Sequence, residues 1–298
     1  MDILFDHTGR LRSIWRFLAG VIVCIVANFI AGGIAQTVAS TPRRLDIVYR
    51  PTLMLLLLAG FSFLLMALDR VERNPLAAMG LPFHALSLVQ TAIGLLIGSG
   101  MIVLAVAVIA VFGGLQVQAK FTPHAILLAG VELVILLTGA MAEELMFRGY
   151  PFQRLIEAIG PPSAIVVFSL LFGAVHLRNP HASLWGFLNT ILVGVLFSVA
   201  YLRTRSLWTP CGMHFSWNAM LGLIFGLPVS GLTEFAVVVR SHAGGPVWLT
   251  GGEYGIEASA LGTFVLVLGL IAVLRFVPKY EPLARATRNR SIALQSRE

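Results

Sequence analysis

The sequence predicts an all-α protein that crosses a membrane several times, and two observations lead to this fold class. Of its 298 residues, 57% are hydrophobic and only 12% are charged, whereas a soluble domain carries about 25% charged residues. The apolar residues also fall into eight runs, each near the ~20 residues that a helix needs to cross the hydrocarbon. We therefore expect a polytopic helical bundle with about eight transmembrane helices.

Short connectors join the fourth to the seventh of these runs, which predicts one compact bundle for that part of the chain. We divide the chain into residues 1–123 with helices one to three and an interfacial segment, residues 124–227 with helices four to seven, and residues 228–298 with an outer loop, the last helix and a basic tail. The expected helices are Ile14–Val38, Tyr49–Leu68, Leu86–Phe112, His124–Arg148, Pro162–Leu177, Ser183–Leu202, Leu207–Leu227 and Ala258–Val277.

The net charge of +7 is placed as in a membrane protein rather than as in a nucleic-acid-binding protein. Basic residues favour the cytoplasmic side of a membrane, and they cluster before the first helix and after the last. The first predicted outer loop is also basic and argues the other way, but the balance favours two cytoplasmic termini. The terminal clusters consist of Arg10, Arg12, Arg16, Lys279, Arg285, Arg288, Arg290 and Arg297.

Small residues in two of the helices predict close packing rather than chemistry. Gly94 and Gly98 form a GxxxG pattern, which lets two helices approach closely. Cys24 and Cys211 stand in apolar runs without metal-like spacing, so we expect two buried, unpaired thiols.

Three charged residues stand near the end of the fourth predicted helix, in "MAEELMFRGY" (residues 141–150). Ionisable groups inside a bilayer are expensive and mark functional sites. Glu144 and Arg148 are four residues apart on a helix and can pair, whereas Glu143 is rotated by about 100° and can face another group. The alternative is a helix end at the membrane interface, where charges cost little.

Two histidines in other predicted helices favour the functional interpretation. His176 follows Phe172 by one helical turn in the fifth helix, and Asn218 follows His214 by one turn in the seventh. A single histidine on an apolar helix usually packs without a catalytic role. Two histidines together with a carboxylate pair supply a base, hydrogen-bond donors and an amide that can stabilise an oxyanion.

The three patterns EExxxR (Glu143, Glu144, Arg148), FxxxH (Phe172, His176) and HxxxN (His214, Asn218) resemble those of the CAAX-protease and bacteriocin-processing family, also called CPBP or Abi. Its members are intramembrane endopeptidases and include the CAAX prenyl endopeptidases of the Ras-converting type. The resemblance covers roughly residues 127–225, so it makes the part 124–227 the expected catalytic core.

The resemblance implies a role for each of these residues. Glu143 and His176 would activate a water, His214 and Asn218 would stabilise the oxyanion, and Glu144 with Arg148 would hold the site together. Two versions stay open: one needs no cofactor, and the other places a zinc ion on Glu143, His176 and His214. We favour the metal-free chemistry, although "metalloprotease" is a label used for the family.

A simple up-and-down bundle would separate Glu143 from His176 by about 15 Å in depth, at ~1.5 Å per residue. For the two side chains to meet, the fourth helix must continue past Arg148 or the fifth must begin late, and Gly149 and Pro151 offer a kink. We expect the carboxylates at intermediate depth, in a cavity open to the cytoplasmic side.

The sequence thus predicts an intramembrane endopeptidase acting on a membrane-associated protein or peptide, with the lipid bilayer and no nucleic acid as partners. The compact chain favours a prokaryotic inner membrane. Two other functions fit the same residues: a proton- or cation-coupled transporter, and a catalytically silent membrane scaffold. Against a transporter, the sequence has neither an inverted repeat nor paired broken helices.

Overall fold

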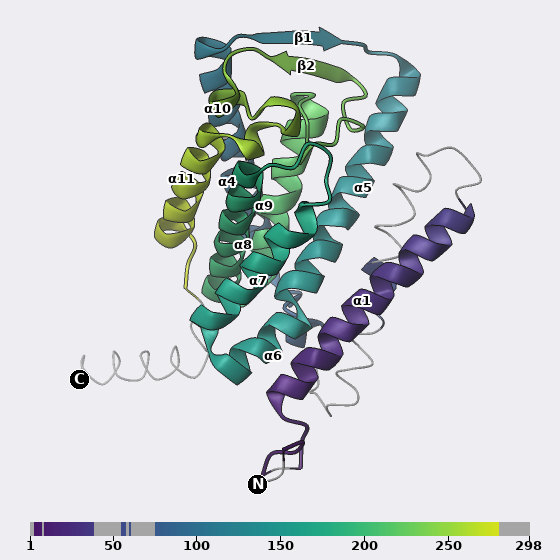
Figure 1. Ribbon diagram of the computed structural model, residues 1–298, viewed down its shortest axis with the longest axis vertical. Helices are drawn as coiled ribbons and strands as arrows, with labels where there is room; N and C mark the ends of the chain where they lie inside the picture. The colour runs from purple at the N-terminus through teal and green to yellow at the C-terminus, as the bar shows by residue number, and fades with distance from the viewer. Residues whose placement is uncertain (1–2, 8, 39–54, 58–59, 61–74, 280–298) are drawn as a thin grey trace.

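The computed structural model describes residues 3–7, 9–38, 55–57, 60 and 75–279, and Figure 1 shows its helices gathered into one bundle with α1 along one side. A small two-stranded sheet covers one end of this bundle. The elements in chain order are α1 (Ser13–Val38), α3 (Pro75–Ala78), α4 (Ala85–Phe112), β1 (Leu115–Ala119), α5 (Pro123–Arg148), α6 (Tyr150–Ile159), α7 (Pro161–His176), α8 (Leu184–Thr204), α9 (Trp208–Ala219), the π-helical turn η1 (Met220–Ile224), β2 (Val239–Ala243), α10 (Val247–Thr250), the 3₁₀ turns η2 (Gly252–Tyr254) and η3 (Ile256–Ala258), and α11 (Ala260–Phe276).

The helices of an integral membrane protein are present, although the predicted number of spans is not confirmed. By length and composition, four stretches within the described residues could cross a membrane: Ser13–Ile34, Ala85–Phe112, Pro123–Ile159 and Leu184–Thr204. Helices α7 and α11 are apolar but shorter, with 16 and 17 residues. The predicted helix Tyr49–Leu68 lies almost wholly outside the described residues, and the tail after residue 279 lies outside them as well. Eight spans and two cytoplasmic termini therefore stay predictions.

The described residues are mostly helical, as predicted, but one end of the molecule carries two strands that the sequence did not predict. Strands β1 and β2 pair in antiparallel register, with Leu115 opposite Ala243 and Ala119 opposite Val239. Each strand lies in a connection between helices, and β1 alternates apolar residues with glutamine in the two-residue period of a strand. The expected outer loop after η1 is thus partly ordered by pairing with the α4–α5 connection.

The predicted kink after Arg148 is confirmed. It places the end of α7, which carries His176, at the level of Glu143. Helix α5 ends at Arg148, and Pro151 in the first turn of α6 has no N–H to continue the α5 hydrogen-bond ladder. Figure 1 shows α6 turning across the lower end of the bundle between α5 and α7. Phe152 of α6 is fully buried and lies edge-on to Phe168 of α7, with ring centroids 5.3 Å apart. The chain therefore starts α7 well beyond the end of α5, so the far end of α7 can reach Glu143.

The GxxxG pattern packs α4 against α9, as predicted from the sequence. A Cβ atom at Gly94 would overlap the carbonyl oxygen of Thr209, and one at Gly98 would overlap the Ser216 hydroxyl and the Met213 carbonyl. Only glycine permits this approach, which holds the backbone of α9 directly against α4. Since α9 carries His214 and Asn218, this contact fixes their position in the bundle.

Candidate active site

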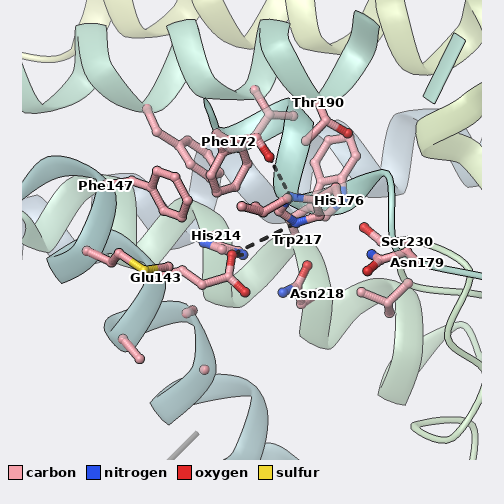
Figure 2. Close-up of a pocket in the computed structure, with 18 of the residues that line it drawn as sticks. Glu143, Phe147, Phe172, His176, Asn179, Thr190, His214, Trp217, Asn218 and Ser230 are labelled. Atoms are coloured by element: carbon pink, nitrogen blue, oxygen red, sulfur yellow. Dashed lines mark hydrogen bonds and ion pairs between the residues drawn. The ribbon is translucent and has the colours of Figure 1, made fainter. Parts of the chain in front are cut away.

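A cavity of about 1100 Å³ opens between α1, α5, α7, α8 and α9, and the four residues predicted to do chemistry line it. They are Glu143, His176, His214 and Asn218. Figure 2 shows these side chains gathered at the cavity although they come from three different helices. The structure therefore brings together residues that lie up to 75 positions apart in the chain.

Glu144 and Arg148 lie behind this cavity, not in it. Both side chains are fully buried, and Nη1 of Arg148 donates to Oε1 of Glu144 at 3.1 Å across one turn of α5. The same carboxylate oxygen lies 3.0 Å from Nδ1 of His214 on α9. The pair predicted from the i, i+4 spacing thus forms, and it reaches a third residue on another helix.

Aromatic rings and one backbone carbonyl hold the buried guanidinium of Arg148. Its Nη2 donates to the carbonyl oxygen of Gly194 in α8 at 3.2 Å, and its Cζ lies 4.6 Å from the ring centroid of Phe172. Cation–π contacts of this kind strengthen when water is excluded. Phe172, the first residue of the FxxxH pattern, therefore supports the ion pair from α7.

Glu143 faces both imidazoles. Its Oε2 lies 4.0 Å from Nε2 of His176 and 3.8 Å from Nε2 of His214. Its side chain is 34% exposed, whereas those of His176 and His214 are 16% and 9% exposed. One carboxylate oxygen and two ring nitrogens therefore surround a common point that the cavity can fill with water.

The hydrogen bonds on the far side of each ring determine which nitrogen faces Glu143. Nδ1 of His176 lies 2.7 Å from the carbonyl oxygen of Phe172, and Nδ1 of His214 lies beside the Glu144 carboxylate. Both partners can only accept, so we assign the proton to Nδ1 in each ring. The two Nε2 atoms are then free to accept from a water or, when protonated, to donate.

The zinc version of the site fits only in its donor types. Imidazole nitrogens and a carboxylate are ligands that zinc accepts, and both Nδ1 atoms are engaged as they are in many zinc sites. Within the part of the chain that the structure describes, however, no three His, Cys, Asp or Glu side chains are grouped closely enough to hold a metal ion. The arrangement does not fit a preformed metal site, and we derive no step through one.

Sequence reasoning missed one wall of the cavity. Thr190 of α8, Asn179 after α7, and Trp217, Ser230 and Glu257 also line it, and several of these appear beside His176 in Figure 2. Ser230 and Glu257 belong to the segment after residue 227 that was predicted only as an outer loop. No periodic pattern marks Ser230 and Glu257, and the signal that the sequence offers is an acidic residue directly before the predicted helix Ala258–Val277.

Comparisons with known proteins agree with the motifs. Residues 125–220 match the sequence model of the family described as "Type II CAAX prenyl endopeptidase Rce1-like". A stretch of 102 residues is 28% identical to the "Putative membrane peptidase YdiL" of Bacillus subtilis (strain 168). The matched stretch covers 34% of this chain and 40% of that protein. No solved structure matches the chain significantly. All three motifs fall inside residues 125–220, so the predicted resemblance is confirmed: this segment is similar to the Rce1-like type II CAAX prenyl endopeptidases.

Proposed function

We propose that the protein is an intramembrane endopeptidase that hydrolyses a peptide bond of a membrane-associated protein or peptide. The observation that carries this proposal is the meeting of one Glu143 oxygen with the Nε2 atoms of His176 and His214, all within 4.0 Å. A silent scaffold does not need three such groups to converge, and against a transporter the sequence has neither an inverted repeat nor paired broken helices.

Glu143 is the proposed general base. A water held between its carboxylate and Nε2 of His176 gives a proton to the carboxylate, and the oxygen adds to the carbonyl carbon of the substrate. When the carbon–nitrogen bond breaks, the protonated Glu143 returns that proton to the leaving amine. The carboxylate is thereby regenerated, and the net reaction consumes one water.

His214 and Asn218 are the proposed oxyanion donors. A protonated His214 can donate from Nε2 while Glu144 balances its charge through Nδ1, and the Asn218 side chain can donate from its amide. Donors that are already in place where charge develops stabilise a transition state without reorganisation. Glu144 and Arg148 act through His214, because their contacts orient its ring.

The substrate class follows from the surroundings of the site. The cavity is lined by apolar side chains of α1, α5 and α7 as well as by the polar groups, so it suits a peptide whose flanking residues or attached groups are apolar. The proposal also places the protein in a prokaryotic inner membrane, and it requires neither a prenylated substrate nor a metal ion.

The test is cleavage of fluorescein-labelled casein by the full chain, purified in dodecyl maltoside. Glu143→Gln should lower the rate at least about 100-fold, the usual contribution of a general base, with an unchanged melting temperature. Glu253→Gln is the matched control, since that side chain is 79% exposed and pairs with His181. Cleavage by Glu143→Gln at the wild-type rate would overturn the proposal.

A further inference from the structure

Glu257 joins three walls of the cavity, although it lies outside the segment that matches the family. Its Oε1 accepts a hydrogen bond from the indole N–H of Trp217 in α9 at 3.0 Å. Its Oε2 accepts from the backbone N–H of Ser230. Its own carbonyl oxygen accepts from Nδ2 of Asn189 in α8 at 2.9 Å. The carboxylate is thus held in one place, and both of its oxygens hold other groups.

Ser230 sits in a tight turn that has to be held by its surroundings. Val229 and Leu232 form a bridge, and both residues between them have positive φ, +48° at Ser230 and +83° at Gly231. This is the backbone of a type I′ turn, in which glycine, asparagine and aspartate are the usual residues. A serine with positive φ costs roughly 1 kcal/mol or more and persists where neighbouring contacts determine it.

Two contacts fix the other half of this turn. The Gly231 N–H donates to the carbonyl oxygen of Tyr254 at 2.9 Å. A Cβ atom at Gly231 would overlap the carbonyl oxygen of Pro180, four residues after His176. The turn is therefore placed against the segment that follows His176, and the charge-assisted bond to Glu257 stabilises the Ser230 conformation.

The other oxygen of Glu257 acts on α9. Trp217 immediately precedes Asn218, the proposed oxyanion donor, at the point where α9 passes into the π-helical turn η1. Figure 2 shows Trp217, Asn218 and Ser230 around His176 at the cavity.

We infer that Glu257 is a positioning residue of the proposed peptidase site. Through one carboxylate it fixes the Val229–Leu232 turn and the Trp217–Asn218 step of α9 around His176. The catalytic part of this inference rests on the proposed function, whereas its structural part does not. The two parts are therefore tested separately.

The structural test measures how firmly the turn is held, without any substrate. Ser230→Cys is labelled with a water-soluble maleimide in full-length protein, where the native Cys24 and Cys211 are buried. Adding Glu257→Gln should raise the labelling rate about tenfold or more, since a lost charge-assisted hydrogen bond weakens the closed turn by that factor. Adding Glu253→Gln, four residues away and exposed, should leave the rate unchanged. Equal rates in all three proteins would overturn the inference.

The catalytic test separates positioning from substrate binding. Glu257→Gln and Trp217→Phe should each lower kcat for casein about tenfold, with KM changed less than about threefold. The double variant should be no slower than the slower single variant, because both changes break the same link. If the effects of the two changes on kcat multiply in the double variant, or if KM alone changes, Glu257 does not act through Trp217. Failure of the wild-type protein to cleave casein would remove the proposed function but leave the labelling result valid.

Discussion

One oxygen of Glu144 lies 3.1 Å from Nη1 of Arg148 and 3.0 Å from Nδ1 of His214. The side chains of Glu144 and Arg148 are both 0% exposed, so neither charge can be compensated by water. The ion pair costs desolvation free energy, yet it gives His214 an orientation that the helix alone does not impose. Stability and site geometry are therefore coupled at this one atom.

Replacing Arg148 should destabilise the protein more than replacing an arginine whose carboxylate partner is exposed. Arg148→Met leaves the Glu144 carboxylate buried without its cation, a change that typically costs about 3–5 kcal/mol. Arg154→Met is the control, because the partner of Arg154, Glu157, is 41% exposed and such pairs contribute about 0–1 kcal/mol. Thermal unfolding in detergent measures both. Similar melting temperatures for the two variants would show that water or another group reaches Glu144.

Substitutions at the two adjacent glutamates should have different effects: one should lower activity, and the other should lower the stability of the fold. Oε2 of Glu143 is buried and has no hydrogen-bond partner among the described residues, so Glu143→Gln should melt no lower than the wild type while losing casein cleavage. Glu144→Gln should melt clearly lower, because it leaves Arg148 as an uncompensated buried charge. The measurement is one melting curve and one casein assay for each variant. A large drop in melting temperature for Glu143→Gln would mean that Glu143 is structural.

Two glycines of α4 provide a matched test of the helix packing that places His214. A methyl group at Gly94 would overlap the Thr209 carbonyl of α9, whereas a methyl group at Gly100 would meet nothing within 4 Å. Gly100→Ala should stabilise the helix by about 0.5–1 kcal/mol. Gly94→Ala should destabilise the protein by about 1–3 kcal/mol, as overpacking does. Equal effects of the two variants on the melting temperature would contradict the close contact of α4 with α9.

Metal analysis tests the choice between the two versions of the chemistry. We expect casein cleavage to persist in 1,10-phenanthroline, and zinc measured by mass spectrometry to stay well below one atom per chain. The reason is that the two Nε2 atoms and Glu143 do not form a preformed metal group. Stoichiometric zinc that disappears in His176→Ala or His214→Ala would instead assign the zinc version. Measuring zinc content and casein cleavage again after adding zinc to the buffer controls for metal that is bound weakly and lost during purification.

The candidate site could be predicted further from the sequence than its surroundings could. Helix geometry alone makes Glu144 and Arg148 neighbours, and the order of the three motifs assigned His176 and His214 to the same site. The distances could not be predicted, because they depend on α6, which shifts the start of α7. Glu257 and Ser230 were missed because a turn and a 3₁₀ segment carry no periodic pattern. Their contacts are set by the tertiary fold rather than by neighbours in the sequence.

Glu257 should make the stability of the protein fall as pH rises. Its burial in η3, outside the membrane-spanning helices, raises the pKa of its carboxyl above the ordinary value of 4.5, while bonds from Ser230 and Trp217 partly oppose the shift. The folded state then holds a proton that the unfolded state has released. The resulting stabilisation is fully present below about pH 4.5 and is lost as pH rises through the raised pKa. Glu257→Gln cannot lose a proton, so the difference in melting temperature between wild type and this variant should shift in favour of the variant from pH 5 to pH 8. Glu253→Gln, at an exposed position in the same segment, should track the wild type over this range. A difference between wild type and Glu257→Gln that is independent of pH would mean that Glu257 titrates normally and that water reaches this wall of the cavity.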